Sequence, residues 1–88
     1  MPVYRYPPPV LEALSRHGAC PLPTTPPAVP RAYVNDLYRF ELRRLRNRLL
    51  AGEFPRHEFA ARVDALRRQY AVLSLPVSQW AEVAVPGS

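Results

Sequence analysis

Three side chains in this sequence have metal-binding or nucleophilic chemistry, namely His17, Cys20 and His57. Imidazole and thiolate groups are ligands that zinc prefers, but zinc sites usually draw them from close pairs such as C-x-x-C or H-x-x-x-H. The sequence contains neither pair. A nucleophilic Cys20 would need a histidine base and an enclosing pocket, which a chain of 88 residues rarely provides. No glycine-rich phosphate loop is present either. The sequence therefore predicts no catalytic residue, no metal and no cofactor.

Arginine is the most abundant side chain that can bind a ligand through its charge. All 12 positive residues are arginine, and the formal net charge is +5. The planar guanidinium group suits carboxylates and phosphates, so an acidic partner surface or a nucleic acid is a chemically reasonable ligand. The alternatives are a solvated helix face and the arginine-rich composition typical of a GC-rich genome. The candidate contacts to anions or nucleic acid are Arg39, Arg43, Arg46, Arg67 and Arg68.

These arginines belong to two helical patterns. Apolar residues recur at helical spacing in both patterns, which predicts helices over about 31–51 and 55–71. Gly52 is placed to end the first helix and Pro55 to begin the second. So short a connection forces the helices to run antiparallel. We therefore predict an all-α fold built on a helical hairpin. The two apolar stripes are Val34, Tyr38, Leu42, Leu45 and Leu49, and Phe59, Val63, Leu66 and Tyr70.

The segments on either side of the hairpin are rich in proline or in apolar residues. A short helix is predicted over about 9–17, with Gly18 as its stop, and the run of prolines over 19–30 predicts an extended strap. Residues 73–88 lose the helical period and predict an irregular apolar tail. The chain is thus expected to form one small domain over 1–88, with an arm over 1–30, a hairpin core over 31–72 and the tail.

Two groups of apolar residues exceed what the hairpin alone can bury. Tyr33, Leu37 and Phe40 form a second, lateral strip on the first long helix, which either the N-terminal arm or another chain must cover. Trp80 in the tail either closes the open end of the hairpin or docks into a partner. All four residues are therefore candidates for a partner interface.

The segment LRRLRNRLLAGEFPRHEFAARVDAL resembles the short C-terminal domain, SHOCT, a small helical-hairpin module of many prokaryotic proteins. The similar features are the leucines of the first helix, Gly52 followed by Phe54, and Glu58-Phe59 with Arg62 and Leu66 in the second. Here the hairpin is central, its first helix is longer, and Pro55 stands where Thr or Ser is usual. The resemblance implies a hairpin that mediates oligomerisation or protein contacts.

No stretch of the sequence has the apolar length of a secretion signal or a membrane span. The single cysteine permits no disulfide within the chain, so we expect a soluble cytoplasmic protein. The predicted function is that of a small non-enzymatic interaction protein or accessory subunit, whose partner is another protein or a second copy in a homodimer. The alternative is a nucleic-acid-binding protein that contacts phosphates through the Arg39, Arg43 and Arg46 face.

Overall fold

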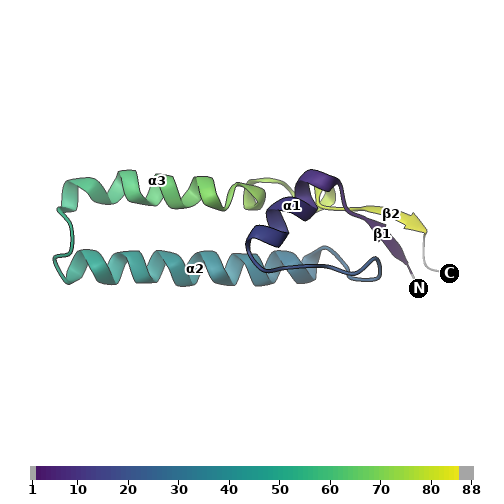
Figure 1. The fold of residues 1–88 in the computed structure, drawn as a ribbon, viewed down its shortest axis with the longest axis horizontal. Coiled ribbons are helices and arrows are strands. Elements are labelled where there is room, and N and C mark those ends of the chain that lie inside the picture. The colour runs from purple at the N-terminus through teal and green to yellow at the C-terminus, as the bar shows by residue number, and fades with distance from the viewer. Residues whose placement is uncertain (1, 86–88) are drawn as a thin grey trace.

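Two long helices set the shape of the molecule. The computed structural model describes residues 2–85, apart from the side chain of Val85. Helix α2 (Ala28–Leu50) and helix α3 (Phe59–Gln69) lie side by side and run in opposite directions (Figure 1). The molecule is a rod with extents of 55 × 17 × 17 Å. Among the residues described, no helix combines the length and apolar character needed to cross a bilayer.

Glycine ends two of the helices in the way the sequence predicts. Gly18 follows helix α1 (Pro8–Arg16) with φ of 81°, and Gly52 follows α2 with φ of 76°. In both cases the next residue's N–H donates to a carbonyl in the last turn, from Ala19 to Leu14 at 2.9 Å and from Glu53 to Arg48 at 3.0 Å. These bonds satisfy carbonyls that a helix end otherwise leaves unpaired. Two glycines therefore fix where the chain turns back.

The helix boundaries nevertheless differ from the predicted ones. Helix α2 begins at Ala28 rather than near residue 31, because Pro30 lies in its first turn, where the missing N–H has no helical partner in any case. The second long helix is also shorter than predicted. After Pro55 the chain forms a 3₁₀ turn, η1 (Arg56–Glu58), before α3 begins at Phe59.

The mostly helical character is confirmed, but a small sheet joins the two ends of the chain. Strand β1 (Val3–Arg5) pairs antiparallel with β2 (Glu82–Val85), and Tyr4 lies opposite Val83. The predicted irregular tail was therefore wrong for Glu82–Val85. The backbone N–H of Tyr4 also donates to the carbonyl of Pro23 at 2.7 Å, which attaches the proline-rich strap to the strand. Residues 86–88 of the predicted tail lie outside the described residues.

Between α3 and β2 the tail forms two 3₁₀ turns, η2 (Ala71–Ser74) and η3 (Val77–Gln79). They carry Trp80 into the hydrophobic core, where its side chain is fully buried. Its indole Nε1–H donates to the carbonyl of Leu75 at 3.2 Å, and Arg31 Nη1 donates to the same oxygen at 2.8 Å. The Arg31 guanidinium also lies 5.8 Å from the centre of the indole ring. The tail therefore folds back on the start of α2.

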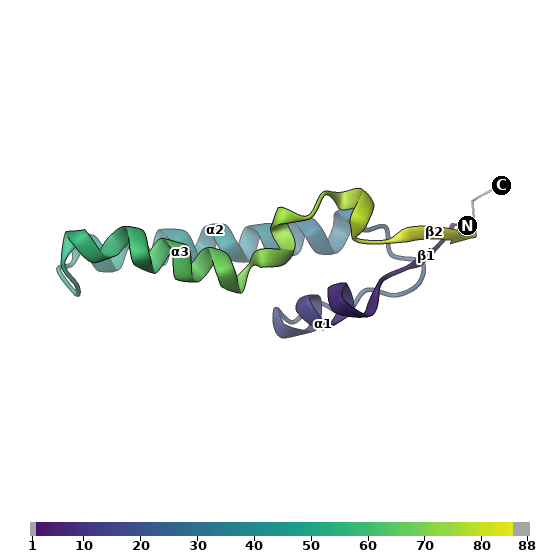
Figure 2. The same cartoon turned by 90° about the horizontal axis from the view of Figure 1, so that it is seen from above.

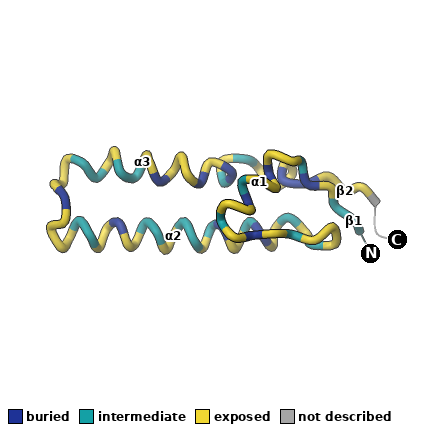
Figure 3. The backbone as a smooth tube through the Cα atoms, viewed as in Figure 1, coloured by how far each residue is buried: buried dark blue, intermediate teal, exposed yellow. Residues whose placement is uncertain are grey.

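Burial is concentrated at one end of the rod (Figure 3). We call residues 39–68, the distal part of the two helices and their connection, the arm. This arm is distinct from the N-terminal arm over 1–30 that the sequence predicts. The remaining described residues are called the head. Helix α1, the strap, both strands and the tail all lie in the head (Figure 2). Within the arm only Leu45, Phe54 and Leu66 are buried hydrophobic residues. The arm is thus a two-helix projection from a packed head, and its stability depends on that head because isolated short helices are marginal in water.

Two buried tyrosines predict a loss of stability in alkaline solution. Desolvation raises the pKa of both Tyr6 and Tyr70 above the usual value of 10.0. The folded state holds these two phenolic protons more tightly than the unfolded state. The stabilisation that the protonated tyrosines contribute is therefore complete below about pH 10 and is lost as the pH rises through the pKa of the folded state. Urea titrations followed by circular dichroism are expected to show a falling free energy of unfolding above about pH 10. Tyr6→Phe is expected to make that fall shallower.

Tyr6→Phe also has an effect at neutral pH, which must be separated from its effect on the alkaline fall. Tyr6 Oη donates to the carbonyl of Thr25 at 2.6 Å, so Tyr6→Phe also lowers the free energy of unfolding at neutral pH, by about 1 kcal/mol. An equally steep alkaline fall in the variant and in the parent protein would show that Tyr6 does not contribute to it.

Candidate functional site

The residues with metal-binding chemistry do not come together. The His17 ring stacks on Tyr70 with 4.2 Å between centroids, and its Nε2–H donates to the carbonyl of Gln69 at 2.9 Å. Cys20 is exposed in the strap, and His57 lies in η1 at the opposite end of the rod (Figure 1). Across residues 2–85 no three His, Cys, Asp or Glu side chains are grouped so that they could hold a metal ion. His17 therefore attaches α1 to the end of α3.

The candidate interface residues fall into three different environments. Leu37 packs against the core of the head, and Trp80 is fully buried there. Tyr33 and Phe40 remain 47% and 55% exposed. The head therefore covers part of the lateral strip and leaves its two aromatic residues accessible. Trp80 closes the hairpin from within the chain and presents no surface to a partner.

The arm carries the whole net charge of the protein. Residues 39–68 contain nine of the twelve arginines and four of the seven carboxylates, while the other residues contain three of each. Three ion pairs lie in the arm, between Arg48 and Glu53 at 3.4 Å, Arg62 and Glu58 at 3.4 Å, and Arg67 and Asp64 at 3.6 Å. Because these pairs are largely exposed, each contributes little to stability. Their arginines remain available for other contacts.

The predicted anion-binding residues are exposed along the arm. Arg39, Arg43 and Arg46 have no carboxylate oxygen within 4.0 Å among the residues that the structure describes, which is also true of Arg68. Arg67, by contrast, pairs with Asp64. Arg39, Arg43 and Arg46 lie on α2, whereas Arg67 and Arg68 lie in the last turn of α3. The candidates therefore form two groups on separate helices.

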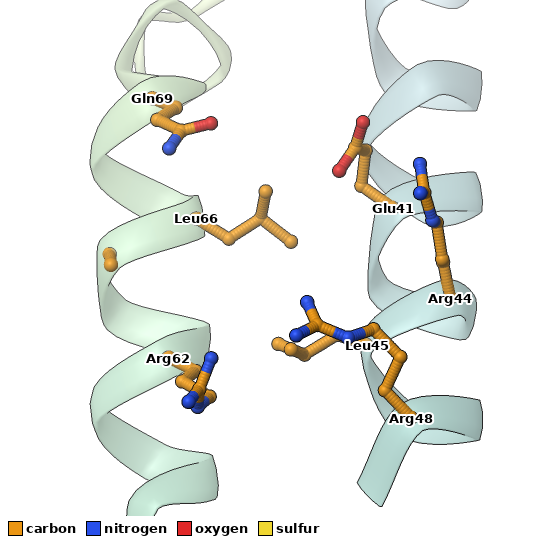
Figure 4. Close-up of a pocket in the computed structure, with 8 residues that line it drawn as sticks. Glu41, Arg44, Leu45, Arg48, Arg62, Leu66 and Gln69 are labelled. Carbon is orange, nitrogen blue, oxygen red and sulfur yellow. The ribbon is translucent and has the colours of Figure 1, made fainter. Parts of the chain in front are cut away.

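A groove between α2 and α3 was not predicted from the sequence. It has a volume of about 370 Å³, and the buried Leu45 and Leu66 point toward each other across it (Figure 4). Charged side chains from both helices surround these leucines. The lining residues are Glu41, Arg44, Leu45 and Arg48 from α2, and Arg62, Ala65, Leu66 and Gln69 from α3. Each set repeats at i, i+3, i+4 and i+7, which places its four residues on one face of their helix. The helical spacing in the sequence could therefore have indicated both walls of the groove.

Aromatic contacts fix the distal end of the groove. The Arg62 guanidinium lies 4.2 Å from the centre of the Phe54 ring, and that of Arg48 lies 5.8 Å from it. Phe54 is itself buried, 6% exposed, in the connection between the helices. Such cation–π contacts hold the two guanidinium groups over the ring without neutralising them. Arg48 and Arg62 already pair with Glu53 and Glu58 at 3.4 Å, but these pairs are exposed and weak, so a carboxylate of a partner can replace the glutamate.

The fold and the candidate site together define a small, mostly helical protein with a packed head and a basic, protruding two-helix arm. Comparisons with protein-family models, with curated proteins and with solved structures gave no significant match. Any functional conclusion must therefore come from the residues and the geometry of this chain.

Proposed function

We propose that the protein is a non-enzymatic interaction module or accessory subunit that binds an acidic surface of a protein partner with its arm. The observation that carries this proposal is the location of the entire net charge of +5 on the arm, where Phe40 is also exposed. Arginine and aromatic residues are enriched in protein interfaces, and both are common among the residues that dominate binding energy. The packed head then serves to hold the arm in a fixed shape.

A second copy of the chain is a weaker candidate for this partner. Two arms that each carry the same positive charge repel one another, which disfavours an arm-to-arm dimer at low ionic strength. A homodimer through the head would instead use exposed apolar residues such as Leu22, Val29 and Tyr33. The protein-contact role implied by the SHOCT resemblance agrees with either assembly, and that relationship remains a prediction.

Nucleic acid is the second candidate ligand, and one observation favours it. Arg39, Arg43 and Arg46 are exposed on α2 and have no carboxylate partner among the described side chains. Phosphate contacts of this kind release counterions, so affinity falls steeply and linearly with the logarithm of salt concentration. A salt titration with duplex and single-stranded DNA tests this alternative directly. Absence of binding at low salt would exclude it.

The proposed role predicts a large effect of Phe40→Ser on partner binding and a small one on stability. Phe40 is 55% exposed, so the substitution is expected to change the free energy of unfolding by less than about 0.5 kcal/mol. At an interface, loss of an aromatic anchor typically costs about 2 kcal/mol or more, equivalent to a roughly thirtyfold weaker complex. Affinity purification from the native host with quantitative mass spectrometry, followed by binding of the purified partner, measures this effect.

Leu50→Ser is the matched control, because Leu50 is also exposed on α2 (68%) but lies at its last turn. We expect the partner to be retained by this variant and lost by Phe40→Ser. Sedimentation showing a stable monomer, combined with no specific copurifying protein, would overturn the proposed function. A stable homodimer of both variants would assign the interface to the head.

A further inference from the structure

The groove between α2 and α3 continues the surface on which α1 packs. Leu66 belongs to the core cluster together with Val10 and Leu14 of α1, and it also lines the groove. Gln69 likewise lines the groove, while its carbonyl accepts the hydrogen bond from His17 just after α1 ends. Helix α1 thus lies against η2, beside the end of α3, and the groove between α2 and α3 continues from there into the arm.

The composition of the groove indicates what could occupy this continuation. Its centre is apolar, formed by Leu45, Leu66 and the methyl group of Ala65. Its distal end carries Arg48 and Arg62, which lie 3.4 Å from Glu53 and Glu58, whereas the Arg44 guanidinium lies beside Glu41 (Figure 4).

Figure 4 shows Glu41 at the end nearer Gln69, so the acidic wall residue lies apart from Arg48 and Arg62. The groove therefore offers an apolar centre, a basic distal end and an acceptor at its proximal end.

We propose that this groove binds an acidic amphipathic helix of the protein partner, which lies on the arm as α1 lies on the head. Leucine-like side chains of that helix contact Ala65 and the small exposed edges of Leu45 and Leu66, and its carboxylates pair with the groove arginines. Helix-in-groove binding of this kind uses apolar anchors at i, i+3, i+4 and i+7. The proposal rests on the proposed function and specifies the binding site and the chemistry of the partner.

The groove itself favours a protein helix over nucleic acid. A phosphate backbone would place negative charge beside Glu41, and it offers no apolar groups for the leucines at the centre. A second copy of this chain is disfavoured by charge, because the arm and the groove it contains are basic. Charge complementarity therefore selects an acidic partner.

The test uses a fluorescein-labelled synthetic peptide of about 15 residues, long enough to form a helix, with leucines on one face and glutamates beside them. A peptide with glutamine in place of every glutamate is the control ligand. Fluorescence anisotropy is measured with the full chain and with two pairs of variants. Arg44→Gln changes a groove arginine, whereas Arg46→Gln removes the same charge from outside it. Ala65→Met fills the groove, whereas Ala61→Met adds the same side chain at an exposed position of α3 outside it.

We expect Arg44→Gln and Ala65→Met each to weaken binding of the glutamate peptide about tenfold, or about 1.4 kcal/mol. Arg46→Gln and Ala61→Met are expected to change it less than about twofold. Circular dichroism must show the same helix content and melting temperature for all four variants. Backbone amide shifts in NMR spectra are expected to change at residues 44–48 and 62–69.

Equal effects of Arg44→Gln and Arg46→Gln would overturn the groove as the site, because only the overall charge would then matter. No binding of the glutamate peptide to the parent protein would also overturn it. If the partner is still captured by the parent protein and lost by Phe40→Ser, the proposed function stands without the groove. A DNA oligonucleotide that binds more tightly than the peptide and loses affinity equally with both arginine variants would support the nucleic-acid alternative.

Discussion

Replacement of Trp80 by alanine is expected to remove about 3–5 kcal/mol of stability, as for other buried aromatic residues. Trp80 is one of the largest fully buried side chains, and it contacts both the tail and the start of α2. Domains of this size have only about 5–15 kcal/mol of total stability, so the loss removes a large fraction. Thermal unfolding followed by circular dichroism is expected to show a melting temperature lower by more than about 10 °C.

Val77→Ala provides the control for this prediction. Val77 lies in η3, three residues before Trp80, but it is 40% exposed. We expect it to change the free energy of unfolding by less than about 1 kcal/mol. A Trp80→Ala variant as stable as Val77→Ala would mean that the tail does not close the head. Because Trp80 is the only tryptophan, the parent protein also reports this packing through its own fluorescence.

The second large effect is expected for Leu14→Ala, which removes a fully buried side chain from α1. Loss of a buried leucine costs about 2–5 kcal/mol. Helix α1 has only nine residues, too few for a stable helix in water, so its structure depends on docking against η2 and the core of the head. Hydrogen exchange measured by mass spectrometry is expected to show faster exchange over residues 8–19 than in the parent protein.

Leu11→Ala separates docking from helix propensity, because Leu11 lies on the same helix and is 40% exposed. This control is expected to leave exchange in α1 nearly unchanged and to cost less than about 1 kcal/mol. If both variants show the same exchange, α1 is held by something other than its buried face. If Leu14→Ala also weakens the peptide complex, the groove requires α1 at its proximal end.

Much of the helical structure could be predicted because its determinants are local. Gly18 and Gly52 supply the left-handed backbone that ends two helices, and their positions in the sequence mark both stops. The stripe from Val34 to Leu49 is buried or half-buried in the structure, whereas Arg39, Arg43 and Arg46 are exposed. Helical spacing determines both properties. Burial of Trp80 within the chain was one of the two alternatives that the sequence left open.

The sheet could not be predicted for a physical reason. Strands β1 and β2 have three and four residues and lie at opposite ends of the chain, so neither shows a usable alternation by itself. Their pairing depends on Trp80 and α1 bringing the two ends together. The early start of α2 was missed because Pro30 was taken as a helix breaker, although a first-turn proline is compatible with a helix.

The groove was missed for a different reason. Helical spacing shows which residues share a face, but not how far along that face a third element extends. Helix α1 ends beside Gln69, so it does not extend over the residues that line the groove beyond this point. The length of α1, which Gly18 sets, thus determines that Arg44 and Arg48 line an open groove.

The uneven distribution of charge has a consequence for how fast the protein meets its partner. A rod 55 Å long, with all of its net charge toward one end, has a large electric dipole. In the field of an acidic surface such a molecule rotates before contact, so that the arm arrives first. Orientation of this kind raises association rates toward 10⁸–10⁹ M⁻¹s⁻¹ at low salt, compared with roughly 10⁵–10⁶ M⁻¹s⁻¹ for neutral partners. Stopped-flow measurements are therefore expected to show salt acting mainly on the association rate.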